Sequence, residues 1–132
     1  MENKRRVYFS HSIRGKLGAD CPIETQEENC AAAIEVTNEI RLACPEFDIY
    51  VPAENEEFVQ IAFNMMYLTE KQILDVDCVI VDNCDIVLVY VPEGDELQGG
   101  RLVEYTHAKG INKPVLVYAT AEAAIVWLKG LL

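Results

Sequence analysis

The sequence predicts a small doubly wound α/β domain, with a parallel sheet of strand order 2-1-3-4 and helices on both faces. Two observations predict it. Short β-rich runs alternate with longer helical stretches along the chain, which implies right-handed crossovers between parallel strands. The run 85–91 (DIVLVYV) is almost continuously apolar, as a strand in the middle of a parallel sheet is. The 132 residues fit a single domain over 1–132.

Composition and charge exclude several classes of protein. With 51% apolar residues the chain can bury enough surface to fold. A net charge of −11 argues against binding a nucleic-acid polymer or an anionic membrane. No apolar run approaches the roughly 18 residues that span a bilayer. The five cysteines are odd in number and lack CxxC spacing, so we expect neither disulfides nor a zinc site. Free thiols are typical of the cytoplasm, which is the compartment we expect. We also expect no metal and no cofactor.

The first half of the chain reads as two strands flanking a long helix. We expect the helix to begin at Thr25, because Thr25-Gln26-Glu27-Glu28 matches a capping box. It should end before Pro45, since a residue that precedes proline avoids helical geometry. The predicted elements are a strand over 6–10, a loop over 12–24, a helix to about Ala43 and a strand over 47–51 that Pro52 closes.

In the second half, a helix should start at Thr69 and place Ile73, Val76 and Ile80 on one face. Asp77 falls near that apolar face, where a carboxylate is costly to bury unless it has a partner or a task. The remaining predicted elements are a helical region over 55–66, a strand over 85–91, a loop over 92–100, a helix over 102–109 that Gly110 ends, a strand over 114–118 and a final helix over 120–131.

The predicted topology locates a candidate binding site. In open α/β sheets, ligands bind outside the carboxyl ends of the strands, at the point where the strand order reverses. Here that point lies between the first strand and the 85–91 strand. We therefore expect the loops 10–18 and 92–100 to meet there.

The first of these loops carries hydroxyls, two cations and a glycine. It reads Ser10-His11-Ser12-Ile13-Arg14-Gly15-Lys16. Arg14 could hold a phosphate through two parallel hydrogen bonds, and Gly15 would let the backbone approach a ligand. The alternative is a solvated loop with ordinary surface cations.

The second loop leads into a helix through Gln98, Gly99, Gly100 and Arg101. Glycines ahead of a helix leave its first N–H groups free to face an anion, and the helix dipole adds to that attraction. Glu104 follows near the first helical turn, where a glutamate is commonly an exposed residue that the dipole favours.

These residues together resemble the nucleoside 2-deoxyribosyltransferase superfamily, and within it the 2'-deoxynucleoside 5'-phosphate N-hydrolases. The resemblance covers about 7–118. It rests on Ser12-Ile13-Arg14-Gly15 after the first strand, on the spacing from Asp77 to Asp85, and on the segment 104–110 (EYTHAKG) with the strand that follows.

The resemblance implies a role for each residue. Glu104 would be the nucleophile that attacks the anomeric carbon, Asp77 a second carboxylate that assists proton transfer, and Tyr8 a tyrosine that positions the acidic pair. The loop Ser12, Ile13, Arg14 and Gly15 would surround the nucleotide, while Gln98 and Gly100 would hold the 5' end of the sugar. From their place in the two loops we also count Ser10, His11 and Gly99 among the binding residues. Arg101, by its position, could add a cation.

The implied activity is cleavage of the base–sugar bond of (deoxy)nucleoside 5'-monophosphates. Two neighbouring acids suit this chemistry, and like charge should raise the pKa of one of them. Three alternatives stay open: a deoxyribosyltransferase that exchanges bases, a nucleotide-binding module without turnover, and a purely structural partner protein. We also expect a homodimer or larger homo-oligomer.

Overall fold

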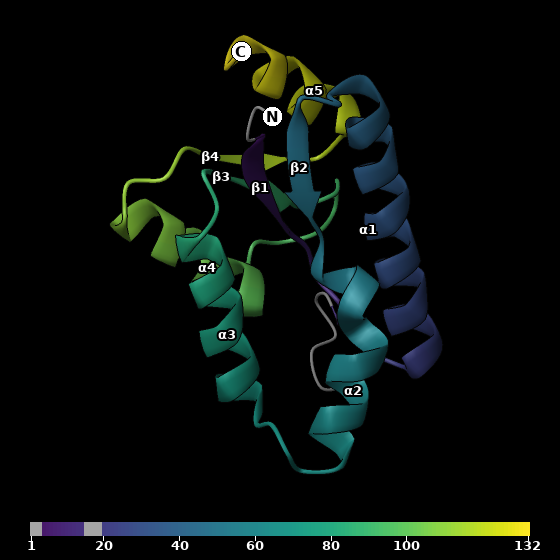
Figure 1. Cartoon of the computed structure of the whole chain (residues 1–132). Coiled ribbons are helices and arrows are strands. Elements are labelled where there is room, and N and C mark those ends of the chain that lie inside the picture. The colour runs from purple at the N-terminus through teal and green to yellow at the C-terminus, as the bar shows by residue number, and fades with distance from the viewer. Residues whose placement is uncertain (1–3, 15–19) are drawn as a thin grey trace.

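The computed structural model describes residues 4–14 and 20–132, and its core is a four-stranded parallel sheet of order β2-β1-β3-β4 (Figure 1). The predicted fold class and strand order are confirmed. The strands are β1 (Arg5–Ser10), β2 (Phe47–Tyr50), β3 (Ile86–Tyr90) and β4 (Val115–Tyr118).

Helices connect the strands and cover the sheet on both sides. None of the helices in the described part of the chain has the length and apolar character that crossing a bilayer requires. The helical elements are α1 (Ile23–Ala43), the short 3-10 helix η2 (Pro52–Asn55), α2 (Glu56–Asn64), α3 (Glu70–Asp82), α4 (Gly99–Gly110) and α5 (Ala121–Gly130).

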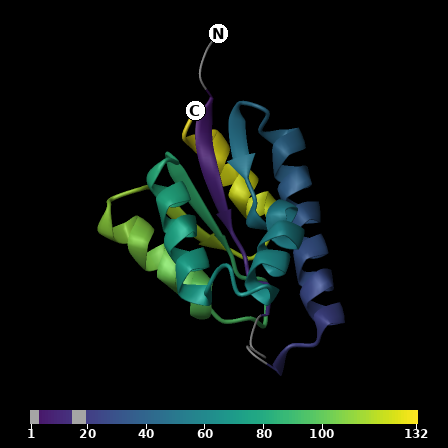
Figure 2. The same ribbon diagram turned by 60° about the horizontal axis from the view of Figure 1, so that its bottom comes forward.

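The two faces of the sheet support two separate cores, because neighbouring residues of a strand point to opposite faces. Val7 and Phe9 of β1 pack on the side of α1 and α5, with Ile40 and Leu128. Tyr8 packs on the side of α3 and α4, in a second cluster that includes Val81, Val87 and Ala108. Figure 2 shows the sheet between these two helical layers.

Two predicted helix boundaries were wrong. α1 begins at Ile23, because the Gln26 N–H already bonds to the Pro22 carbonyl at 3.0 Å, so Thr25 lies inside the helix and caps nothing. α4 begins at Gly99 and not at Leu102, so its glycines form the first helical turn and do not precede it.

α3 begins as predicted, with Thr69 in a capping box with Gln72. Its buried face was predicted less well, since the Val76 side chain is 53% exposed. The face of α3 that lines the pocket described below carries Ile73, Leu74 and Asp77. Each residue turns a helix by about 100°, so Val76 falls outside that face while Asp77 falls on it.

Candidate active site

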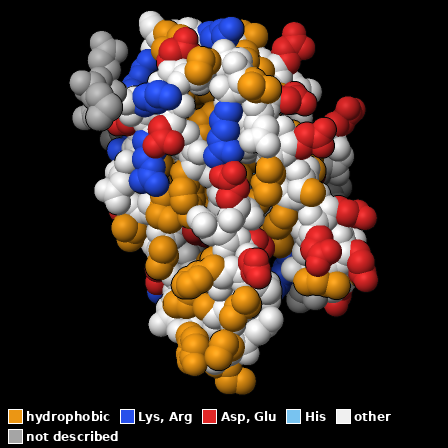
Figure 3. Space-filling model, turned by 45° about the vertical axis from the view of Figure 1, so that its right-hand side comes forward, with side chains coloured by type: hydrophobic (Ala, Val, Ile, Leu, Met, Phe, Trp, Pro, Cys, Tyr) orange, Lys and Arg blue, Asp and Glu red, His pale blue; other side chains and the backbone are white. Residues whose placement is uncertain are grey.

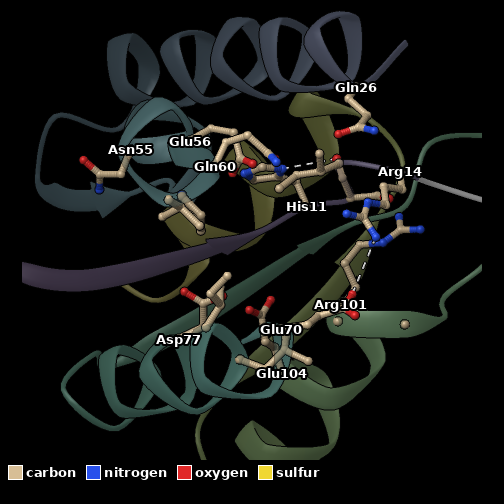
Figure 4. Close-up of a pocket in the computed structure, with 18 of the residues that line it drawn as sticks. His11, Arg14, Gln26, Asn55, Glu56, Gln60, Glu70, Asp77, Arg101 and Glu104 are labelled. Atoms are coloured by element: carbon tan, nitrogen blue, oxygen red, sulfur yellow. Dashed lines mark hydrogen bonds and ion pairs between the residues drawn. The ribbon is translucent and has the colours of Figure 1, made fainter. Parts of the chain in front are cut away.

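A pocket of about 590 Å³ opens at the carboxyl ends of the strands, where the strand order reverses. Its volume lies in the range of small-molecule sites. One wall comes from α3 and the start of α4, and the opposite wall from the loop after β1 and from α2 (Figure 4). A neighbouring cavity of about 370 Å³ lies between the loops after β1 and β3, so these two predicted loops do meet.

Glu104 sits in the second turn of α4 and is only 4% exposed. Tyr8 donates a hydrogen bond to its Oε2 at 2.7 Å, and Ser10 donates one to its Oε1 at 2.6 Å. Both donors come from β1, and because they are two residues apart they point to the same face of the sheet. The central strand therefore holds the carboxylate of Glu104 at the bottom of the pocket through both of its oxygens.

Asp77 lies beside Glu104 on the same wall (Figure 4). It comes from α3, one turn after Ile73 and Leu74, which also line the pocket. The structure therefore brings together the two carboxylates that the sequence singled out, although 27 residues separate them.

Burial raises the pKa of both acids, that of Glu104 to about 8 and that of Asp77 to about 6. The bonds from Ser10 and Tyr8 lower the pKa of Glu104, while the charge of Asp77 raises it. Two carboxyls that interact so closely titrate as a pair, which holds about one proton near neutral pH. Because the pKa of Glu104 is the higher of the two, the shared proton rests on Glu104, and the bonds from Ser10 and Tyr8 favour its transfer to Asp77 when Glu104 acts as a nucleophile.

His11 follows β1 and is 9% exposed. Its Nε2 accepts a hydrogen bond from the Ala53 N–H at 3.0 Å, which assigns the proton to Nδ1, 3.3 Å from the Ser12 carbonyl oxygen. Burial lowers its pKa to about 4, so the ring is neutral at physiological pH. His11 therefore ties the loop after β1 to η2 and contributes a neutral surface to the pocket.

Arg14 also lines the pocket, with a side chain that is 36% exposed. Its partner is Glu70 at 3.8 Å, which is 74% exposed, so the pair is weak and open to exchange. Ser12 and Ile13 line the same wall, and Asn29 holds the Ile13 carbonyl at 2.8 Å. Gly15 lies outside the described residues.

The start of α4 forms the end of the pocket. Gln98 is the residue before the helix, Gly99 has a left-handed φ of 60°, and a Cβ on Gly100 would lie 3.1 Å from Leu74. A side chain would strain the first position and crowd the second. The amides of this first turn have no partner within the helix, which suits them to bind an anion.

The sequence did not predict the contacts that the Arg101 side chain makes. Its side chain is 2% exposed and pairs with Asp95 at 3.0 Å, and it donates to the carbonyls of Tyr90 and Glu96 at 2.8 Å each. These contacts brace the loop after β3, and Asp95 offsets the charge of Arg101, which also lines the pocket and whose Nε has no hydrogen-bond partner among the described residues. A sequence cannot reveal this, because the partners are mostly backbone carbonyls.

The sequence did not identify the α2 wall of the pocket. Glu56 is half-buried there, and burial together with the charge of Asp77 raises its pKa. The spacing of the pocket-lining residues of α2 is helical, which is the one signal that could have marked this face. They are Glu56, Val59, Gln60 and Phe63, preceded by Asn55.

Among residues 4–14 and 20–132, no three His, Cys, Asp or Glu side chains are arranged so that they could hold a metal ion. The five cysteines are free thiols. The pocket offers the acid pair Glu104 and Asp77, with hydroxyl donors from Tyr8 and Ser10 and the guanidinium of Arg14 nearby.

Comparison with protein families and with curated proteins finds no match for this chain. A solved structure, the crystal structure of a conserved protein from Enterococcus faecalis V583, is similar, with a TM-score of 0.61 and 18% identity. The similarity covers 87% of this chain and 63% of that protein, so this chain spans less than two thirds of its length. At this identity the likeness bears on the fold alone.

Proposed function

We propose that this chain is an N-glycosidase that hydrolyses the base–sugar bond of (deoxy)nucleoside 5'-monophosphates. One observation carries the proposal: Glu104 and Asp77 share a buried wall of one pocket, and Tyr8 and Ser10 donate to both oxygens of Glu104. Two acids at one sugar-sized site are the equipment of retaining glycosidases.

In the first step, a carboxylate oxygen of Glu104 attacks C1' of the sugar while the C1'–N bond breaks. The electron pair of that bond leaves with the base, which takes the proton of Asp77. Tyr8 and Ser10 hold the attacking carboxylate in one orientation, so little reorganisation is needed. The product of this step is a glycosyl ester on Glu104 and a free base.

In the second step, water attacks C1' and Asp77, now ionised, accepts the proton of that water. The ester bond breaks, its electron pair returns to Glu104, and the sugar phosphate leaves. The pair then holds one proton again, as the perturbed pKa values of both acids favour near neutral pH.

Arg14 and the first turn of α4 are the groups we assign to the 5'-phosphate. Glu70 is exposed and 3.8 Å from Arg14, so a phosphate with two charges could displace it. The amides of Gly99 and Gly100 begin a helix and can donate to the same anion.

The test is release of free base from a set of (deoxy)nucleoside 5'-monophosphates, with the products separated by chromatography. We expect Glu104→Gln to lower the rate at least about a thousandfold, as loss of a nucleophile does, while binding of the monophosphate persists. Glu122→Gln, an exposed change in the first turn of α5, is the matched control and should leave the rate unchanged. Base release that survives Glu104→Gln would overturn the assignment.

The same assay separates the alternatives. A deoxyribosyltransferase shares the first step but lets a second base attack C1', so adding a free base would yield an exchanged nucleotide. A binding module would bind monophosphates, seen as a rise in Tm, without releasing base. The proposal includes a cytoplasmic location and a homo-oligomeric state for the protein. The free thiols support the cytoplasm as the compartment.

A further inference from the structure

A second cavity of about 370 Å³ adjoins the candidate active site, and the proposed reaction makes no use of it. Its volume falls within the range of about 300 to 1,000 Å³ that small-molecule sites have. Four residues line both cavities, namely His11, Ser12, Arg14 and Arg101. Figure 4 shows Arg14 and Arg101 at one end of the larger pocket and Asp77 at the other. The second cavity therefore continues the active site beyond its arginine end.

In the proposed complex, the 5'-phosphate of the substrate would lie at the boundary of the two cavities. Arg14, the cation we assign to this phosphate, is among the residues that line both. From the phosphate, the sugar has to extend into the larger pocket, because its C1' must reach Glu104. A group joined to the other side of the phosphate then faces the second cavity.

Polar side chains from two elements line the second cavity. Thr25 and Asn29 of α1 lie four residues apart, and Ala32 follows after three more, so all three share one face of the helix. The loop after β3 contributes Glu93 and Asp95. Carboxylates at a nucleotide site bind the hydroxyls of a sugar, while their charge repels a terminal phosphate. The lining therefore suits a neutral group that carries hydroxyls.

The buried guanidinium of Arg101 distinguishes this cavity from the rest of the surface. Carboxylates alone would not, because acidic side chains are spread over the face that Figure 3 shows, in keeping with the net charge of −11. The Arg101 side chain is 2% exposed, and its Nε has no hydrogen-bond partner among the described residues. A buried donor without a partner lowers the stability of the fold. Because Arg101 belongs to the wall that both cavities share, a ligand oxygen held at that wall can accept from Nε and offset this cost.

We propose that the second cavity is a subsite for a sugar joined to the 5'-phosphate, so that the substrates include nucleoside diphosphate sugars. This assignment rests on the proposed function and deepens it, because Glu104 and Asp77 would break the same base–sugar bond. The two phosphates would lie near Arg14 at the boundary, and the distal sugar would lie between α1 and the loop after β3. A bare diphosphate is the poorer ligand, since its terminal phosphate carries extra charge towards Glu93 and Asp95.

Two neighbouring alanines of α1, both exposed, provide a matched pair of variants. Ala32 lines the second cavity, so Ala32→Trp fills it with an indole ring. Ala31 is absent from the described lining of either cavity, so Ala31→Trp is the control. Glu93→Gln, at an exposed loop position, is a further variant that adds no bulk. The melting temperature of each variant shows whether the fold persists.

The experiment is titration calorimetry of the full chain with matched sets of nucleotides. The probes are ADP-ribose, UDP-glucose, GDP-mannose, CDP-glucose and dTDP-glucose, each compared with its own monophosphate and diphosphate. We expect at least one diphosphate sugar to bind about tenfold more tightly than both of these, a gain that two new hydrogen bonds can supply. Ala32→Trp should abolish this advantage and leave binding of the monophosphate unchanged, whereas Ala31→Trp should retain it.

Glu93→Gln should narrow the difference between a diphosphate sugar and its bare diphosphate, because an amide repels the terminal phosphate less than a carboxylate does. The subsite is overturned if no diphosphate sugar binds more tightly than its monophosphate, if the advantage survives Ala32→Trp, or if a bare diphosphate binds as tightly as its sugar. Loss of the advantage in Ala31→Trp, or an unchanged difference in Glu93→Gln, would contradict it as well.

Base release from the same compounds separates this subsite from the proposed function. Release from monophosphates without any preference for diphosphate sugars in binding would overturn the subsite alone. Tight binding of a diphosphate sugar that never loses its base would overturn the glycosidase and leave the subsite standing.

Discussion

Replacing Tyr8 by Phe removes a single hydroxyl, the one that donates to Glu104 Oε2 at 2.7 Å. The ring should stay in place, since it is buried and stacked on Tyr50 with ring centroids 5.8 Å apart. Glu104 keeps its bond from Ser10 but loses half of the support for its ionised form. The variant therefore isolates the effect of one hydrogen bond on the acid pair.

The magnitude follows from the geometry. A short hydrogen bond to a buried charged group contributes about 1.5 to 3 kcal/mol. One pKa unit corresponds to about 1.4 kcal/mol, so the pKa of Glu104 should rise by about 1 to 2 units. Because a protonated Glu104 cannot attack the sugar, the acid limb of the pH–rate profile should move upward by that amount. Activity at pH 7 should fall about 10- to 100-fold.

The assay is base release from a nucleoside monophosphate between pH 5 and 9, for the wild type, Tyr8→Phe and the control Tyr118→Phe. The hydroxyl of Tyr118 is buried and has no hydrogen-bond partner among the described residues, so its removal changes a buried tyrosine without touching Glu104. A Tyr8→Phe profile that coincides with that of the wild type would refute the role of this hydroxyl.

Three further changes test the energetics by melting or urea unfolding. Burial raises the pKa of Glu104 in the folded state to about 8, so between its unfolded value and pH 8 the folded carboxyl holds a proton that the unfolded one has lost, and the wild type becomes less stable as pH rises. Glu104→Gln lacks this proton uptake and should gain at least about 3 °C in Tm relative to the wild type between pH 5 and 8, and a constant Tm difference would contradict this. Thr69→Ala removes the capping box with Gln72 and should cost about 1 kcal/mol; no loss in urea would show the cap to be idle. Asp95→Ala leaves buried Arg101 without its carboxylate partner and should lower the free energy of unfolding by about 3 kcal/mol. An unchanged urea midpoint would show that this ion pair does not stabilise the fold.

Much of the fold was predictable because its signals are local. The apolar run around β3 and the alternation of strands with helices predict a parallel sheet, and the right-handed crossover rule leaves few orders for it. Helix ends were harder to place. A capping-box pattern predicted a helix start at Thr25, but the helix already begins after Pro22. The same kind of pattern at Thr69 does cap a helix.

The candidate site was predictable only in part. Glu104 and Asp77 were singled out through a resemblance, and the structure places both in one pocket. Helical spacing groups Glu56 and Gln60 on one face of α2, but it does not show what that face lines, because their part in the pocket depends on where α2 lies relative to α3. The sequence suggested Arg101 as a cation for a ligand, yet its guanidinium pairs with Asp95 and donates hydrogen bonds to two backbone carbonyls.

By itself the sequence determined the class of fold and the order of its strands, since periodicity and turn residues act over a few positions. Only the tertiary structure decided which distant side chains touch. The hydroxyls of Tyr8 and Ser10 reach Glu104 across more than 90 residues, and the large apolar side chain of Phe58 on α2 stays exposed. Such contacts depend on how whole elements pack, which no short stretch of sequence encodes.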